Sequence, residues 1–72
     1  MKQKITDKTT VPPQGYCYEY RGHNILIEPG FCCLLGEISF NGTIVDSGFC
    51  GYGLATAMAR INTRIDLDLS EQ

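Results

Sequence analysis

Three short turn signals constrain this chain more than any other feature, because they agree on one face of a sheet. Arg-Gly at residues 21–22, Pro-Gly at 29–30 and Asn-Gly at 41–42 each separate two runs rich in β-branched and aromatic residues. Asn-Gly is the strongest short-range hairpin signal, since a type I′ turn needs a positive φ at both central residues. Proline does not supply that conformation, so we expect a four-residue loop over residues 28–31.

The parity of these hairpins predicts how the strands pair. Loops of even length join strands at about residues 16–20, 23–28, 31–40 and 43–47 into an antiparallel meander. Because three independent local signals give one consistent apolar face, we expect that face to be the core side of the sheet, with Ile44 exposed. The residues of the predicted core face are Tyr16, Tyr18, Ile25, Ile27, Cys32, Leu34, Ile38, Phe40 and Val45.

A glycine-rich connection over residues 47–53 leads into a segment with helical periodicity. Its apolar positions recur at the spacing of one helix face, and its alanines favour a helix. Residues 61–69 also alternate with period two, so residues 63–69 fit a fifth strand; we favour a helix to about residue 65 and an irregular tail. The sequence therefore predicts an α+β fold, a four-stranded antiparallel β-meander with one C-terminal α-helix packed on one face. The helical positions are Leu54, Ala57, Met58, Ile61 and Ile65.

Length and charge limit the domain organisation and the partners. The 72 residues suffice for one small domain. Residues 1–14 are polar and contain two adjacent prolines, so we expect a flexible N-terminal arm followed by a single domain over residues 15–72. Residues 15–72 carry seven carboxylates against three arginines, a net charge of −4. This acidic balance lacks the basic footprint of nucleic-acid binding.

The expected location is the cytoplasm. The charged opening is not followed by the apolar run of a secretory signal, and no stretch approaches the ~20 apolar residues of a membrane span. In that reducing compartment we expect the four cysteines to be free thiols rather than a disulfide framework.

The cysteines and the single histidine are the candidate metal ligands and nucleophiles. Structural zinc sites usually have two cysteines with two to four residues between them, and no such pair occurs. Cys32 and Cys33 are adjacent on a predicted strand and would point to opposite faces. A Cys–His nucleophile would also need a third group that orients His23. We therefore predict no metal site, no cofactor, no catalytic residue and no small-molecule substrate.

The second sheet face is the candidate binding surface, because a single helix covers one side of a sheet only. In the simplest register Cys17 lies opposite Leu26, Leu26 opposite Cys33, and Cys33 opposite Cys50. An apolar patch with a polar rim usually marks an interaction surface, although the arm or the tail could also cover it. The predicted partner-binding residues are Leu26, Phe31, Cys33 and Leu35, and the predicted rim is Glu19, Asn24, Glu37, Ser39 and Asp46.

Residues 18–25 and the helical segment that ends in Ile65-Asp66 carry a resemblance. Together they resemble small domains of uncharacterised phage and prophage proteins, in which a Tyr-x-Gly strand opens a short sheet and a single helix ends in Ile-Asp. Those domains have no assigned activity, so the resemblance carries over no functional residues. It implies an accessory protein that occupies a host factor, as small inhibitors of defence systems do.

We therefore predict a non-catalytic protein-binding module. If the resemblance to phage domains holds, the module inhibits a host factor. Two alternatives stay open. One is a thiol- or metal-binding module that uses the cysteines. The other is a homo-oligomeric structural subunit, in which the patch binds a second copy of itself.

Overall fold

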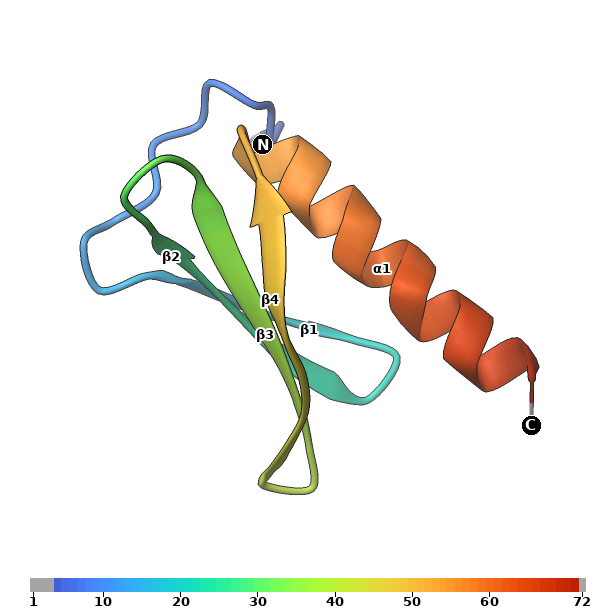
Figure 1. The fold of residues 1–72 in the computed structure, drawn as a ribbon. Helices are drawn as coiled ribbons and strands as arrows, with labels where there is room; N and C mark the ends of the chain where they lie inside the picture. The colour runs from blue at the N-terminus through green and yellow to red at the C-terminus, as the bar shows by residue number, and fades with distance from the viewer. Residues whose placement is uncertain (1–3, 72) are drawn as a thin grey trace.

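The computed structural model describes residues 4–71, except for the side chains of residues 49 and 50. The strands form one antiparallel sheet in the order of the chain, and the helix packs on one face of it, chiefly over the third and fourth strands (Figure 1). The predicted α+β fold, a four-stranded β-meander with one C-terminal helix, is confirmed. The elements are β1 (Tyr16–Tyr20), β2 (His23–Pro29), β3 (Leu34–Phe40), β4 (Thr43–Gly51) and α1 (Leu54–Ser70).

Two of the three turns have the predicted form. The first hairpin pairs β1 with β2 from Tyr16 opposite Ile27 to Tyr20 opposite His23. Its turn residues both have positive φ, as do those of the β3–β4 turn, at 53° for Asn41 and 81° for Gly42. These values are what a two-residue type I′ turn requires.

The middle turn lies two residues later than expected. The loop comprises residues 30–33 rather than 28–31, and the Gly30 amide donates a hydrogen bond of 2.8 Å to the Cys33 carbonyl. Leu26 therefore lies opposite Glu37 and not opposite Cys33. The shift is even, so side chains keep their faces. Cys32 is the exception, because it belongs to this loop and is exposed. Its assignment to the core was therefore wrong.

Two bulges in β4 break the predicted register of the last hairpin. Ile44 lies opposite Ser39, but the next pair joins Asp46 to Ile38, which leaves Val45 as an extra residue. One extra residue turns the rest of a strand over. Val45 is consequently 55% exposed instead of buried, whereas Ile44 is exposed as predicted, at 59%. Gly48, with a φ of 82°, is the extra residue of the second bulge.

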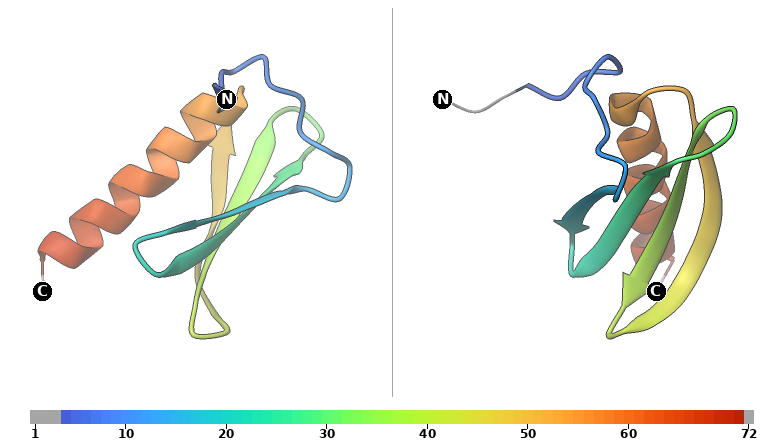
Figure 2. Two further views of the ribbon diagram at one scale, coloured as in Figure 1. Left: turned by 180° about the vertical axis from the view of Figure 1, so that it is seen from behind. Right: turned by 90° about the vertical axis from the view of Figure 1, so that its left-hand side faces the viewer.

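Phe40 was also expected in the core, and its side chain is 41% exposed. The twisted sheet carries the β3–β4 turn away from α1, so the helix does not reach this end of the hairpin (Figures 1 and 2). The Phe40 ring packs instead against His23, with ring centroids 4.9 Å apart.

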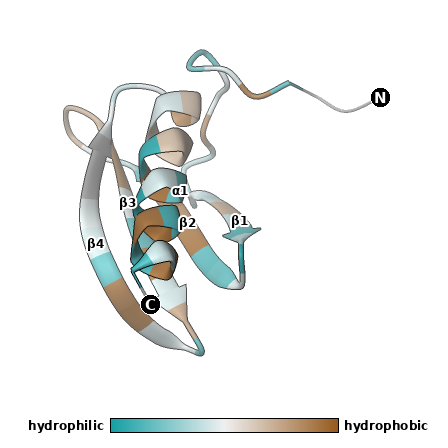
Figure 3. Ribbon diagram, turned by 90° about the vertical axis from the view of Figure 1, so that its right-hand side faces the viewer, coloured by the Kyte–Doolittle hydropathy of each residue, from teal (hydrophilic) through white to brown (hydrophobic). Residues whose placement is uncertain are grey.

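The helix extends to Ser70, so the predicted irregular tail after residue 65 and the alternative fifth strand are both wrong. Leu69 continues the apolar stripe one turn beyond Ile65 and packs against the core. Figure 3 shows α1 in front of the sheet, with hydrophobic and hydrophilic residues alternating along it. The buried core consists of Ile25, Ile27, Ile38, Leu54, Ala57, Ile61 and Ile65.

The N-terminal arm contacts the start of α1. Gly53, the N-cap residue, provides no side-chain cap, and Asp7 takes that role. Its Oδ1 accepts a hydrogen bond from the Thr56 amide at 2.7 Å and its Oδ2 one from the Thr56 hydroxyl at 2.8 Å. Ile5 and Val11 pack against the core. That the arm is flexible stays a prediction, but its contacts lie on the helix side of the sheet.

Candidate functional site

Tyrosine side chains of β1 reach across to α1 on the covered face. The Tyr18 hydroxyl donates to Asn62 Oδ1 at 2.9 Å, and the Tyr20 hydroxyl donates to the Asp66 carboxylate at 3.0 Å. Burial, together with Tyr16 and Tyr20 nearby, raises the pKa of Tyr18 to about 12. These contacts give the tyrosines a structural role in joining the β1 edge to the helix.

The aspartates of α1 are engaged by arginines. The hydrogen bond from Arg21 Nη1 to Asp66, 2.8 Å long, lowers the pKa of that carboxyl. Arg64 Nε lies 3.4 Å from Asp68 and 3.6 Å from Asp46. Asp46 thus faces the helix and does not belong to the rim of the second face as expected. Within residues 4–71, no group of three or more His, Cys, Asp or Glu side chains is placed to hold a metal ion.

The cysteines differ in state. Cys17 and Cys32 are free thiols, as expected, whereas Cys33 takes part in a disulfide, so the expectation was wrong for that residue. His23 lies opposite Tyr20 at the end of the first hairpin, and its Nδ1 is 3.1 Å from the Arg21 carbonyl oxygen. The imidazole is therefore engaged with the turn and with Phe40.

The face of the sheet opposite α1 is uncovered by any helix (Figure 2). The alternation of β1, β2 and β3 places eight side chains on it. Among the described residues, none of these eight has a side-chain hydrogen bond or an ion pair. We call the part of this surface that β1, β2 and β3 form the open face; it consists of Cys17, Glu19, Asn24, Leu26, Glu28, Leu35, Glu37 and Ser39.

Only two of the four predicted partner-binding residues lie on the open face. Leu26 is half-buried, because the backbone of Gly15 lies against its side chain. Leu35 is 48% exposed. Phe31 and Cys33 lie in the loop between β2 and β3, where the Phe31 side chain is fully exposed and Cys33 is half-buried.

Each leucine of the open face lies opposite a glutamate. Leu26 pairs with Glu37 across β2 and β3, and Glu28 pairs with Leu35 on the same two strands. These four side chains border a hollow of ≈ 210 Å³. The sequence indicated Glu37 as a polar neighbour, but Glu28 was assigned to a turn. Its place next to Leu35 follows from the later loop.

A second hollow, of ≈ 480 Å³, lies between the β3–β4 hairpin and the end of α1. Sequence reasoning missed it, because the unbulged register puts Phe40 and Val45 in the core. Nothing in a strand of this composition signals a bulge at Val45. The hollow is lined by Arg21, His23, Phe40, Val45, Asp68 and Leu69.

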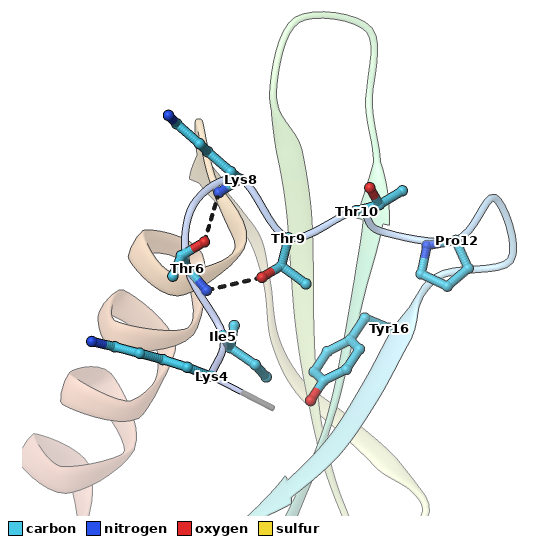
Figure 4. A pocket seen from close by; sticks show the side chains of 8 residues that line it. All are labelled: Lys4, Ile5, Thr6, Lys8, Thr9, Thr10, Pro12 and Tyr16. Atoms are coloured by element: carbon cyan, nitrogen blue, oxygen red, sulfur yellow. Dashed lines mark hydrogen bonds between the residues drawn. The ribbon is translucent and has the colours of Figure 1, made fainter. Parts of the chain in front are cut away.

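A third hollow, of ≈ 700 Å³, lies between the arm and β1. Figure 4 shows that the side chains of Lys4 and Lys8 extend away from Tyr16, so their ammonium groups do not converge. The hydrogen bonds here, from the Thr6 amide to Thr9 and from the Lys8 amide to Thr6, stabilise the arm's own turn. This hollow therefore has no convergent polar groups of the kind that orient a ligand.

The site that the structure offers is thus a mixed apolar and acidic sheet face whose side chains form no hydrogen bond or ion pair within the described part of the chain. Among the residues that the structure describes, no helix has the length and apolar character needed to cross a bilayer. No protein-family model, curated protein or solved structure matches this chain.

Proposed function

We propose that this protein is a non-catalytic binding module that holds a protein partner on the open face of its sheet. The observation that carries the proposal is the contrast between the two faces. Side-chain hydrogen bonds and ion pairs join the arm, β1 and β4 to α1, while the open face has none among the described residues. Leu35 stays 48% exposed there.

Exposed apolar side chains with polar neighbours support a binding role. Leaving a leucine in water forgoes roughly 1.5–3 kcal/mol of burial, and a soluble chain retains such surface most readily where a partner uses it. Phe31 adds a fully exposed aromatic ring at the end of the sheet, close in sequence to Leu35. Aromatic residues of this kind are enriched among the anchors of protein interfaces.

The resemblance to phage domains extends the proposal to an accessory protein that occupies a host factor in the cytoplasm. That extension rests on the resemblance alone. A gene neighbourhood of phage genes or of a defence locus would support it, and a neighbourhood of housekeeping genes would contradict it.

Site-directed photo-crosslinking tests the binding role. A photoreactive phenylalanine analogue at Leu35 should give one discrete adduct in the cells that produce the protein, while the same residue at exposed Thr63 on α1 should give none. Leu35→Glu should abolish an adduct formed from a second open-face position, Ser39, with an unchanged circular dichroism spectrum. Equal adducts from positions 35 and 63, or adducts from neither, would contradict the proposal.

A further inference from the structure

We infer that the partner presents a basic segment to the open face, with lysine or arginine side chains that reach Glu19, Glu28 and Glu37. This inference deepens the proposed function and rests on it. It commits to one kind of occupant, a protein segment that combines positive charges with apolar side chains.

The charge of the open face is uniform in sign. It carries three glutamates, and β1, β2, β3 and β4 contain no lysine or arginine. Glu19 and Glu28 are exposed and Glu37 is half-buried. No lysine or arginine of the described chain forms an ion pair with these carboxylates.

The aspartates behave differently. Asp7 is bonded to Thr56, Asp66 to Arg21 and Tyr20, and Asp46 and Asp68 both lie near Arg64. Intramolecular partners thus engage these four aspartates and leave the glutamates of the open face. A surface of one charge sign attracts and orients partners of the opposite sign.

The pairing of the strands fits basic side chains in particular. Leu26 lies opposite Glu37, and Leu35 lies opposite Glu28, so each leucine has a carboxylate beside it. Lysine and arginine have an aliphatic stem and a charged head, and they favour apolar surface next to an anion. The hollow of ≈ 210 Å³ that these four residues border offers such a place.

The same charges disfavour the other occupants. Two copies that meet through their open faces would bring both sets of glutamates together, and like charges across an interface are destabilising. Nucleic acid would be repelled for the same reason. A basic segment of another protein is the occupant whose charge complements the face.

The inference is tested with two labelled peptides of equal length. One alternates lysine and leucine, and the other alternates glutamate and leucine. Fluorescence anisotropy with the full chain at low salt should show binding of the lysine peptide only. Amide shifts in a ¹H–¹⁵N spectrum should map that binding to β2 and β3. Binding of both peptides alike, or shifts confined to α1, would overturn the inference.

Matched variants distinguish binding at the open face from attraction by the net charge of the whole protein. Glu28→Gln with Glu37→Gln should weaken binding of the lysine peptide by about tenfold or more. The control, Asp68→Asn with Glu71→Gln, removes the same charge from the helix side and should change the affinity by less than about threefold. Equal weakening by both pairs would mean that only net charge acts, which contradicts the inference.

A third variant distinguishes the inference from the proposed function. If Leu35→Ser weakens binding of both peptides and the glutamate pair has no effect, the open face binds through its apolar residues alone. The inference then fails while the proposed function stands. If the Leu35 and glutamate variants all bind the lysine peptide as the original chain does, both fail.

Discussion

The two faces of the sheet contrast in how their polar groups are used. On the face under α1, polar side chains are matched in pairs: Tyr18 with Asn62, and Tyr20 with Asp66. On the open face, acidic and apolar side chains alternate, and none of them has a side-chain hydrogen bond or an ion pair within the described chain. The first arrangement stabilises the fold, and the second leaves charge and apolar surface for another molecule. The comparison teaches that the fold uses the polar side chains under the helix and leaves those of the open face, where we propose that a partner binds.

The largest expected effect tests which face is the core. Ile25→Ala should lower the free energy of unfolding by about 2–5 kcal/mol, because Ile25 is 2% exposed and the substitution leaves a cavity. Ile44→Ala, a matched change at a 59% exposed residue, should cost less than ~1 kcal/mol. Urea denaturation measures both, and equal losses would contradict the assignment of the faces.

The next largest effect tests how closely β4 and α1 are packed. A Cβ built on Gly51 would lie 2.9 Å from the Ala57 Cα, so the helix backbone itself would have to move. Gly51→Ala should therefore cost about 1–3 kcal/mol, the usual range for overpacking a core. Gly42→Ala separates this effect from turn strain, since a Cβ at Gly42 has open space but a φ of 81°. A Gly51 variant as stable as the original chain would show that α1 is not held this closely.

A smaller effect concerns the tyrosine contacts of the covered face. Tyr18→Phe removes the hydrogen bond to Asn62 and should cost about 0.5–1.5 kcal/mol at neutral pH. Tyr52, which is 87% exposed, supplies the control Tyr52→Phe, for which we expect no loss. A thermal melt that shifts equally for both variants would argue against the role of this bond.

The raised pKa of Tyr18 also predicts a pH dependence. The hydroxyl ionises near pH 10.0 in the unfolded chain and near 12 in the folded one. Its contribution to stability is therefore complete below pH 10 and lost as the pH rises towards 12. Unfolding curves measured between pH 9 and 12 should show that the free energy of unfolding falls more steeply with pH in the original chain than in Tyr18→Phe.

The smallest effect lies on the open face. Glu28→Gln with Glu37→Gln should change the free energy of unfolding by less than ~0.5 kcal/mol, since these carboxylates have no partner to lose. Asp66→Asn should be destabilising, because it removes a charged acceptor from Tyr20 and Arg21. Denaturation at neutral pH compares the two, and a larger loss for the glutamate pair would mean that the open face serves the fold.

Stability at low pH tests the contacts of the aspartates. The folded pKa values of Asp7 and Asp66 lie below 3.8, so their contribution is present above that pH and is lost as the pH falls below it. Asp66→Asn should flatten this part of the stability curve.

The strand order, both two-residue turns and the isoleucine core could be predicted from the sequence. The reason is that these features are local: Asn41-Gly42 selects a turn type, and alternation within a strand assigns faces. The middle loop lies two residues later than predicted, but Ile25, Ile27 and Ile38 still share a face. A shift by an even number of residues changes the register and not the face to which a side chain points.

Of the candidate site, the sequence predicted the surface but not its pattern. It identified Leu26 and Leu35 as uncovered by the helix. It did not pair them with Glu37 and Glu28, because Pro29 was read as part of the loop and lies in β2.

The tertiary structure alone decided the bulge at Val45, the exposure of Phe40 and the cap at the start of α1. Each depends on how distant segments fit together, as when Asp7 bonds Thr56 across 49 residues. Local propensity carries no information about such contacts, because their free energy arises only once the sheet and the helix have packed. The sequence by itself determined which elements form and which face is apolar, and packing determined where each strand deviates and which carboxylates stay without a partner.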